Sequence, residues 1–144
     1  FSDSSVIKIS LPNKITKIGT GAFHRCKTLK MLKFPKESEK IGICKKAFAQ
    51  SSIENVCIFS KTCMIYQSAF SYCTDLKTFE FLGENITIDI FCFNHCDNLV
   101  LMSFPNANKI TVDETSFTYV SNNFVLFSLI DTLTIYSSDL LDLV

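Results

Sequence analysis

The chain has 144 residues, of which 47% are hydrophobic, and its formal net charge is zero. This composition is too apolar for a disordered chain, and the length suffices for one domain with a core of its own. Fourteen basic and fourteen acidic residues balance each other, and we expect them to be spread out, without the basic stripe that a nucleic-acid partner requires. No uninterrupted apolar run approaches the roughly 20 residues of a membrane span. The start at Phe1, without methionine, favours a piece of a longer protein.

One pattern of apolar residues recurs along the chain. An alternating apolar pair precedes a phenylalanine, here called the anchor, and apolar or small residues follow three, six, nine and eleven positions after it. The stretch from Val6 to Leu11 supplies half a unit. The anchors of the later units, spaced by 25, 22, 23, 24 and 23 residues, are Phe23, Phe48, Phe70, Phe93, Phe117 and Leu140. Near-copies at such a period indicate a repeat architecture.

Two units differ from the others in length. The second lacks one residue after Ser51, so its later apolar positions come one step early. The fifth has one extra residue after Val120, so that Phe124, Phe127 and Leu129 come one step late. The charged run 36–40 is predicted to be an exposed loop, where added length costs little.

A unit this short cannot bury its own apolar side and must stack on its neighbours. The step from nine to eleven is the alternation of a strand, and the apolar pair before the anchor predicts a second short strand on the opposite side. The segment around the anchor predicts a tight bend or a turn of 3₁₀ helix. Stacking then aligns the anchors into an internal aromatic spine. We expect one solenoid domain over residues 1–144.

Residues 18–35 read Ile-Gly-Thr-Gly-Ala-Phe-His-Arg-Cys-Lys-Thr-Leu-Lys-Met-Leu-Lys-Phe-Pro. This unit closely resembles the BspA-type leucine-rich repeat, although Ser51 and Val120 replace its cysteine in two copies. The resemblance implies a right-handed leucine-rich-repeat solenoid, β-rich with short parallel strands, of about five to six repeats of 22–25 residues. It also implies a surface protein of bacteria or parasitic protists that adheres to host cells or matrix proteins.

A leucine-rich repeat usually meets its partner on the strand face, so the outward strand positions are the candidate binding residues. The first three coils present mixed charge there and the last two present an apolar patch, which often marks an interface. The alternative is that a cap, a neighbouring coil or a second copy covers this patch. The candidate partner-binding residues are Lys30, Met31, Lys33, Glu54, Lys77, Glu80, Val100, Leu101, Val125 and Leu126.

The seven cysteines are interpreted mainly as buried thiols, because most occupy apolar positions of the repeat. Cys92, His95 and Cys96 lie close in sequence, but no second ligand pair is near to complete a tetrahedral zinc site. Cys73 and Cys96 would stack in adjacent coils, where parallel side chains rarely meet the torsion of a disulfide. We therefore expect no metal and a ladder of free thiols.

No set of residues for catalysis or for a cofactor is apparent. The two histidines, His24 and His95, each follow an anchor turn, and only four glycines are available for a phosphate cradle. Asn85 begins an Asn-Ile-Thr sequon in a predicted connection and is a candidate glycosylation site. We predict neither enzymatic activity nor a cofactor.

The leading hypothesis is a protein-interaction module of a cell-surface or secreted adhesin that binds a protein or glycan ligand on a host cell or matrix. The alternative is a cytoplasmic or structural repeat scaffold, which unpaired cysteines favour because reducing compartments keep thiols free. Exposed coil ends would also permit self-association.

Overall fold

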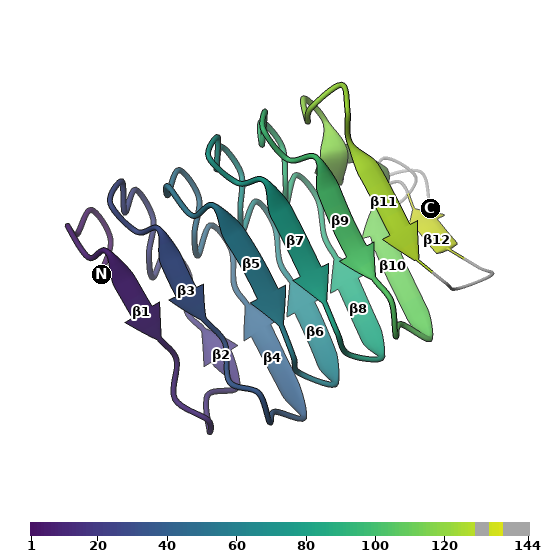
Figure 1. The fold of residues 1–144 in the computed structure, drawn as a ribbon, viewed down its shortest axis with the longest axis horizontal. Coiled ribbons are helices and arrows are strands. Elements are labelled where there is room, and N and C mark those ends of the chain that lie inside the picture. The colour runs from purple at the N-terminus through teal and green to yellow at the C-terminus, as the bar shows by residue number, and fades with distance from the viewer. Residues whose placement is uncertain (129–132, 137–144) are drawn as a thin grey trace, which may run out of the picture.

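The computed structural model describes residues 1–128 and 133–136, and within them the chain winds into a parallel β-solenoid (Figure 1). Each coil places one short strand on each of two sides. The strands of one side, here called the front face, are β1 (Lys8–Ser10), β3 (Met31–Lys33), β5 (Asn55–Ile58), β7 (Thr78–Phe81), β9 (Leu101–Phe104) and β11 (Val125–Ser128). The other side, the back sheet, holds β2 (Lys17–Ile18), β4 (Lys40–Ile43), β6 (Thr62–Ile65), β8 (Asn85–Ile88), β10 (Lys109–Asp113) and β12 (Leu133–Tyr136). One 3₁₀ helix, η1 (Glu114–Phe117), forms the bend of the fifth unit.

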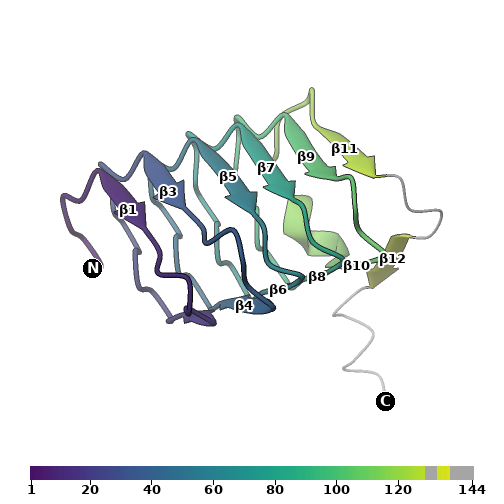
Figure 2. The same cartoon turned by 60° about the horizontal axis from the view of Figure 1, so that its bottom comes forward.

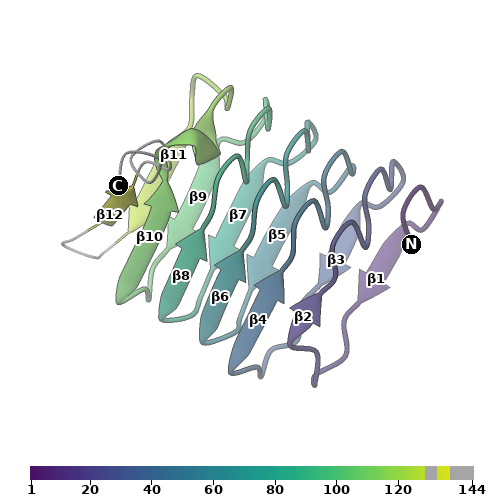
Figure 3. The same ribbon diagram turned by 180° about the vertical axis from the view of Figure 1, so that it is seen from behind.

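The two sides differ in continuity. The back sheet is one parallel sheet in the order β12-β10-β8-β6-β4-β2 (Figure 3). The front face consists of a β1-β3 pair and a separate four-stranded sheet β11-β9-β7-β5 (Figure 2). The front-face ladder therefore stops between β3 and β5, at the unit that is one residue short.

Strand alternation separates core from surface. In β7, Phe79 and Phe81 are fully buried, while Thr78 and Glu80 are half-buried on the outer side. The lead-in pairs behave in the same way on the back sheet, where Ile86 and Ile88 face inward. The predicted second strand is therefore confirmed. A sheet whose two sides differ this strongly has only one register that buries its apolar residues.

The anchor phenylalanines form the predicted spine. Ring centroids of successive anchors lie 5.2–5.9 Å apart, and their planes differ by 2–13°. Phe1 is the first ring of the spine, because it stacks on Phe23 at 5.5 Å. The half unit at the start of the chain thus has an anchor, which the sequence pattern missed.

The cysteines three positions after the anchor hold neighbouring coils together. Cys73 Sγ donates to the carbonyl of Phe48 at 3.1 Å, and Cys96 Sγ donates to that of Phe70 at 3.2 Å. Cys26 makes the same contact to Phe1 at 3.0 Å. Each thiol therefore bonds to the anchor of the preceding coil, and all seven cysteines are free. A small side chain with a weak donor suits this position.

The residue two positions after each anchor phenylalanine adopts a left-handed backbone. Its φ lies between 56° and 59° in Arg25, Gln50, Tyr72, His95 and Tyr119. None of these is glycine, although this conformation costs a side-chain-bearing residue roughly 1–2 kcal/mol. The amide of this residue donates to the next coil, as from Tyr72 N to Asn94 O at 2.8 Å. The bends are thus joined by hydrogen bonds as the strands are.

The predicted register is confirmed in the second unit and wrong in the fifth. Val56 pairs with Phe79, as the missing residue requires. In the fifth unit Val125 pairs with Leu101 and Leu126 with Met102, so no extra residue enters the strand. Leu126 and Met102 both lie nine positions after their anchors. Two of the predicted unit positions, Leu129 and Leu140, lie outside the described residues.

No helix in the described ranges has the length and apolarity needed to cross a membrane.

Candidate functional site: the front face

Charged residues of the front face form a network over the first coils. Lys30 Nζ lies 3.2 Å from Glu54 Oε1 and 3.2 Å from Asp75 Oδ2, and Lys77 Nζ lies 3.6 Å from Glu54 Oε2. Hydrogen bonds to Glu54 and Asp75 raise the pKa of Lys30, and the bond from Lys30 lowers the pKa of Glu54. Pairs this exposed add little stability. Their effect is to fix the positions of both signs of charge where a partner would meet them.

Apolar side chains continue the same face on β9 and β11. Val100 and Leu101 are 40% and 39% exposed, and Val125 and Phe127 are 57% and 45% exposed. These four residues are here called the apolar patch. Val125 lies opposite Leu101, and Phe127 lies opposite Ser103, in adjacent parallel strands. The four side chains therefore form one contiguous surface.

The predicted outward position of Leu126 is wrong. Leu126 is partly buried and packs against the core, because it shares the inner column with Met102. Phe124 packs inward on Phe117, with ring centroids 5.3 Å apart. It lies one position further from its anchor than the leucine that fills this inward place in other units. The chain then regains its register before the strand, since Val125 N donates to Val100 O at 2.9 Å. Val125, opposite Leu101, takes the outer place that was assigned to Leu126, and Phe127, which was assigned to the core, lies on the outer side opposite Ser103.

The remaining predicted residues of this face lie apart from the apolar patch. Met31 is 56% exposed and Lys33 is exposed, both on β3 across the break in the sheet. Glu80 lies on β7 and accepts a hydrogen bond from Cys57 Sγ at 3.5 Å. Partial burial and then this carboxylate raise the pKa of Cys57 to about 11. At neutral pH Cys57 is therefore a thiol and a weak nucleophile.

The predicted glycosylation residue lies on the other side of the solenoid. Asn85 is the first residue of β8 in the back sheet, paired with Thr62 and Lys109, and it is half-buried. It was expected in a connection, and the strand extends to include it. Its backbone amide donates to Lys61 O at 3.1 Å.

The three residues considered for metal binding do not converge. Cys92 and Cys96 are fully buried, and Cys92 Sγ donates to Tyr66 O at 3.2 Å. Burial raises the pKa of both thiols, which disfavours the thiolate form that binds metals. His95 instead stacks on the outside of the bend. Among the described residues, no group of three or more potential ligands could hold a metal ion.

An external row of aromatic rings is a feature that the sequence pattern did not reveal. Tyr72 stacks on His95 at 4.5 Å, and His95 stacks on Tyr119 at 4.4 Å. All three occupy the left-handed bend position, two residues after the anchor. The fixed offset from the anchor is visible in the sequence, but that this offset points outward follows only from the left-handed backbone of the bend.

The charges are not spread evenly, contrary to the expectation from the balanced total. Residues 1–61 contain twelve of the fourteen basic residues and only four of the fourteen acidic ones. Because the coils stack in chain order, one end of the solenoid is basic and the remainder is acidic (Figure 1). Such a separation affects association with charged partners rather than the fold.

Comparisons with known proteins agree with this architecture. A family model for the BspA-type leucine-rich repeat region matches residues 1–124 in six copies. The structure resembles a crystal structure of a leucine-rich repeat protein from Bacteroides ovatus ATCC 8483, with a TM-score of 0.50 and 18% sequence identity. The match covers 85% of this chain and 39% of that one, so the chain spans about two fifths of its length. A search of curated proteins found no significant match. With six copies of the repeat over most of its length, the chain belongs to the BspA-type leucine-rich repeat family.

Proposed function

We propose that this domain is a protein-interaction module that binds a partner protein through its front face. The observation that carries the proposal is the apolar patch of Val100, Leu101, Val125 and Phe127, each about 40% exposed or more. Contiguous apolar surface of this kind marks interaction sites on soluble proteins. The repeat family supports the general role, because leucine-rich repeats typically act as interaction scaffolds.

The charged network next to the patch supports a protein partner. The binding surface of such a partner would carry an apolar centre to meet the patch and charges of both signs around it. Interfaces combine a desolvated apolar core with a polar rim. Lys30, Glu54 and Lys77 would supply that rim, with their carboxylates and ammonium groups already held in place by one another. Lys33 and Glu80 would extend it along β3 and β7.

We place the module on a cell surface or in a secreted protein, where it would act as part of an adhesin that binds a host or matrix protein, or a glycan attached to it. A glycan at Asn85 of this protein would be compatible with that location, since the side chain lies on the outer side of β8 and away from the front face. No catalytic step is part of the proposal, because leucine-rich repeats typically serve as non-catalytic scaffolds.

A second candidate is an intracellular scaffold that spaces other domains. The free state of all seven cysteines favours it, because thiols persist in reducing compartments. The two candidate functions predict different modifications of the protein purified from its native source. A glycan at Asn85 supports the adhesin, whereas an unmodified Asn85 with seven titratable thiols after unfolding supports the scaffold.

Binding to immobilised fibronectin, laminin and collagen, measured by surface plasmon resonance, tests the proposal directly. The double variant Val125→Ser and Phe127→Ser should weaken binding on the order of 10–100-fold, because the central apolar contacts of an interface carry most of its energy. Met64→Ser is the matched control, since Met64 is 43% exposed, close to Phe127, but lies on β6 of the back sheet, away from the front face.

Equal binding by the double variant and the wild type would remove the patch from the interface. No binding to any of the three proteins would contradict the matrix-adhesin assignment. Sedimentation of the same samples separates a second copy of this chain from a foreign partner. Loss of a dimer in the double variant would identify the patch as a self-association surface instead.

A further inference from the structure

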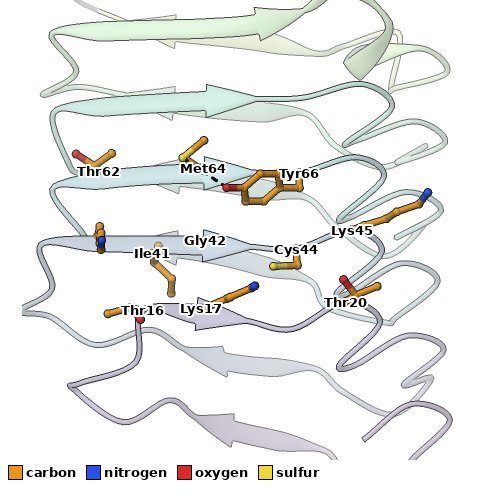
Figure 4. Close-up of a pocket in the computed structure, with 11 residues that line it drawn as sticks. Thr16, Lys17, Thr20, Ile41, Gly42, Cys44, Lys45, Thr62, Met64 and Tyr66 are labelled. Atoms are coloured by element: carbon orange, nitrogen blue, oxygen red, sulfur yellow. Dashed lines mark hydrogen bonds between the residues drawn. The ribbon is translucent and has the colours of Figure 1, made fainter.

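A hollow opens on the outside of the back sheet where one coil lacks a side chain. The outward column of this sheet reads Lys17, Gly42, Met64, Thr87 and Thr111, as the strand registers align these residues. Gly42 therefore leaves a gap between two filled positions. The cavity measures about 630 Å³ and is bordered by β2, β4 and β6 (Figure 4). This volume falls in the range of about 300–1,000 Å³ that is typical of small-molecule sites.

One wall of this Gly42 hollow is aromatic. Tyr66 is 39% exposed, and its ring lies beside Gly42, since a Cβ built on the glycine would be 3.6 Å from Tyr66 Cε2. The Tyr66 hydroxyl is 3.7 Å from Met64 Sδ, which keeps the ring along the edge of the hollow (Figure 4). Three threonines, Thr16, Thr20 and Thr62, border the remaining sides.

The rim of the Gly42 hollow is cationic and uncompensated. Lys17, Lys40 and Lys45 line it, and no carboxylate does. Within residues 1–128 and 133–136, none of these three lysines forms an ion pair. The hollow also lies in the basic part of the solenoid, so the surrounding field attracts anions.

We propose that the Gly42 hollow binds an anionic oligosaccharide, that is, a sugar chain whose rings carry carboxylate or sulfate groups. The ring of Tyr66 offers an apolar surface to the C–H face of a pyranose, the threonine hydroxyls exchange hydrogen bonds with sugar hydroxyls, and the lysines pair with the acidic groups. This site is separate from the front face, so it does not depend on the protein-binding role proposed above.

The backbone of the hollow argues against two other classes of ligand. Gly42 N donates to Thr16 O at 2.9 Å and Cys44 N donates to Ile18 O at 3.0 Å. These amides are consumed by the sheet and cannot form the nest of N–H groups that usually cradles a phosphate. An acidic peptide cannot add as a strand here, because β4 is paired on both sides, with β2 and β6.

Gly42→Thr is the decisive variant. The added Cβ would make ordinary contacts, at 3.6 Å from the Tyr66 ring and 3.9 Å from Thr16 O, and threonine already fills the same column at Thr87 and Thr111. Threonine also suits a strand better than glycine. The variant should fold at least as well as the wild type, while its side chain occupies the floor of the hollow beside the Tyr66 ring and blocks access to the ring there.

Isothermal titration with heparin-derived and polyuronate oligosaccharides, with maltoheptaose as the neutral probe, tests the proposal. We expect an acidic oligosaccharide to bind, and at least a tenfold loss of affinity in Gly42→Thr and in the double variant Lys17→Gln, Lys40→Gln. Lys109→Gln is the matched charge control, because Lys109 occupies the register column of Lys40 three strands away. It should retain the wild-type affinity.

Equal affinity of Gly42→Thr and the wild type would overturn the site, as would equal losses in Lys109→Gln and the Lys17, Lys40 double variant. Absence of heat with both acidic probes at millimolar concentration would overturn the ligand class, as would equally tight binding of maltoheptaose. Success with heparin alone or with the polyuronate alone supports the site and identifies the acidic group.

Discussion

Phe70 is the central ring of the aromatic spine, and its replacement tests how far that spine holds the coils together. The side chain is fully buried. Its ring lies 5.2 Å from that of Phe48 and 5.4 Å from that of Phe93, both stacked, and 5.8 Å from the edge-on ring of Phe79. Phe70→Ala removes all three contacts and leaves a cavity between adjacent coils.

The expected loss of unfolding free energy is about 3–5 kcal/mol, the range measured when buried phenylalanines are truncated to alanine. Phe70→Leu retains most of the apolar volume and removes only the ring pairs. Each aromatic pair contributes about 0.5–1.5 kcal/mol beyond its buried area. Repacking around leucine recovers part of the energy of the lost ring pairs. We therefore expect Phe70→Leu to lower the unfolding free energy by about 2 kcal/mol.

Urea unfolding followed by far-ultraviolet circular dichroism measures both variants, with m-values compared to verify that the same surface unfolds. Phe1→Ala is the control, because Phe1 is 79% exposed and stacks on one ring only. It should cost less than about 1 kcal/mol. A loss below about 1 kcal/mol for Phe70→Ala would refute the spine as a main source of stability.

Three further substitutions or conditions test other parts of the structure. Gly83→Ala should cost more than about 3 kcal/mol by urea unfolding, because its Cβ would lie 2.0 Å from Ser60 O, whereas Gly19→Ala, with open space around it, should be nearly neutral. Burial raises the pKa of Cys73 to about 11 from an ordinary 9.0, so stability present below pH 9 should fall as the pH rises toward 11. The loss of unfolding free energy is about 1.4 kcal/mol per such thiol at pH 10. Cys73→Ala should make this decline with pH less steep. A urea unfolding midpoint of the wild type that stays unchanged between pH 8 and 10 in reducing buffer would contradict the raised pKa. Leu126→Ser should destabilise by about 2 kcal/mol or more and Phe127→Ser by less than about 0.5 kcal/mol, and the reverse order would disprove the register of β11.

The fold could be predicted from the sequence because stacking aligns each repeat position into a column of side chains. All side chains of an inward column meet the same surroundings, so the same type of residue recurs there. Phenylalanine at a fixed interval predicted the spine, and alternation predicted both strand sets. The repeat also placed Cys26, Cys73 and Cys96 inside correctly, but not their hydrogen bonds. Those bonds depend on the anchor carbonyl of the preceding coil, whose direction is set by backbone geometry that spacing alone does not specify.

The fifth unit was mispredicted because two neighbouring residues are both apolar. Leu126 and Phe127 satisfy the strand pattern equally well, and Phe124 sits one step later than the usual leucine. The choice is made by backbone pairing with β9, which hydropathy cannot reveal. A shift of one residue reverses which side chains face the solvent, so the error exchanged a core residue for a surface one in the candidate site.

The Gly42 hollow and the outer aromatic row lay beyond the sequence pattern for another reason. Both are properties of columns on the outer surface, where packing imposes no common residue type. Identifying them requires the strand register of the back sheet and the backbone conformation of the bend. The uneven charge distribution, by contrast, could have been counted from the sequence, and the balanced total concealed it.

Between residues 1 and 128, the left-handed bend gives each coil a position where the backbone is constant and the side chain is unconstrained by the core. The residues at this position are chemically diverse, with an acid, a base, an amide, two phenols and an imidazole: Asp3, Arg25, Gln50, Tyr72, His95 and Tyr119. Hydrogen bonds between neighbouring coils fix the spacing of these side chains. Substitutions at this position could therefore place a chosen row of functional groups along the bend, one per coil. Asparagine or glycine would suit the coils where only stability is wanted.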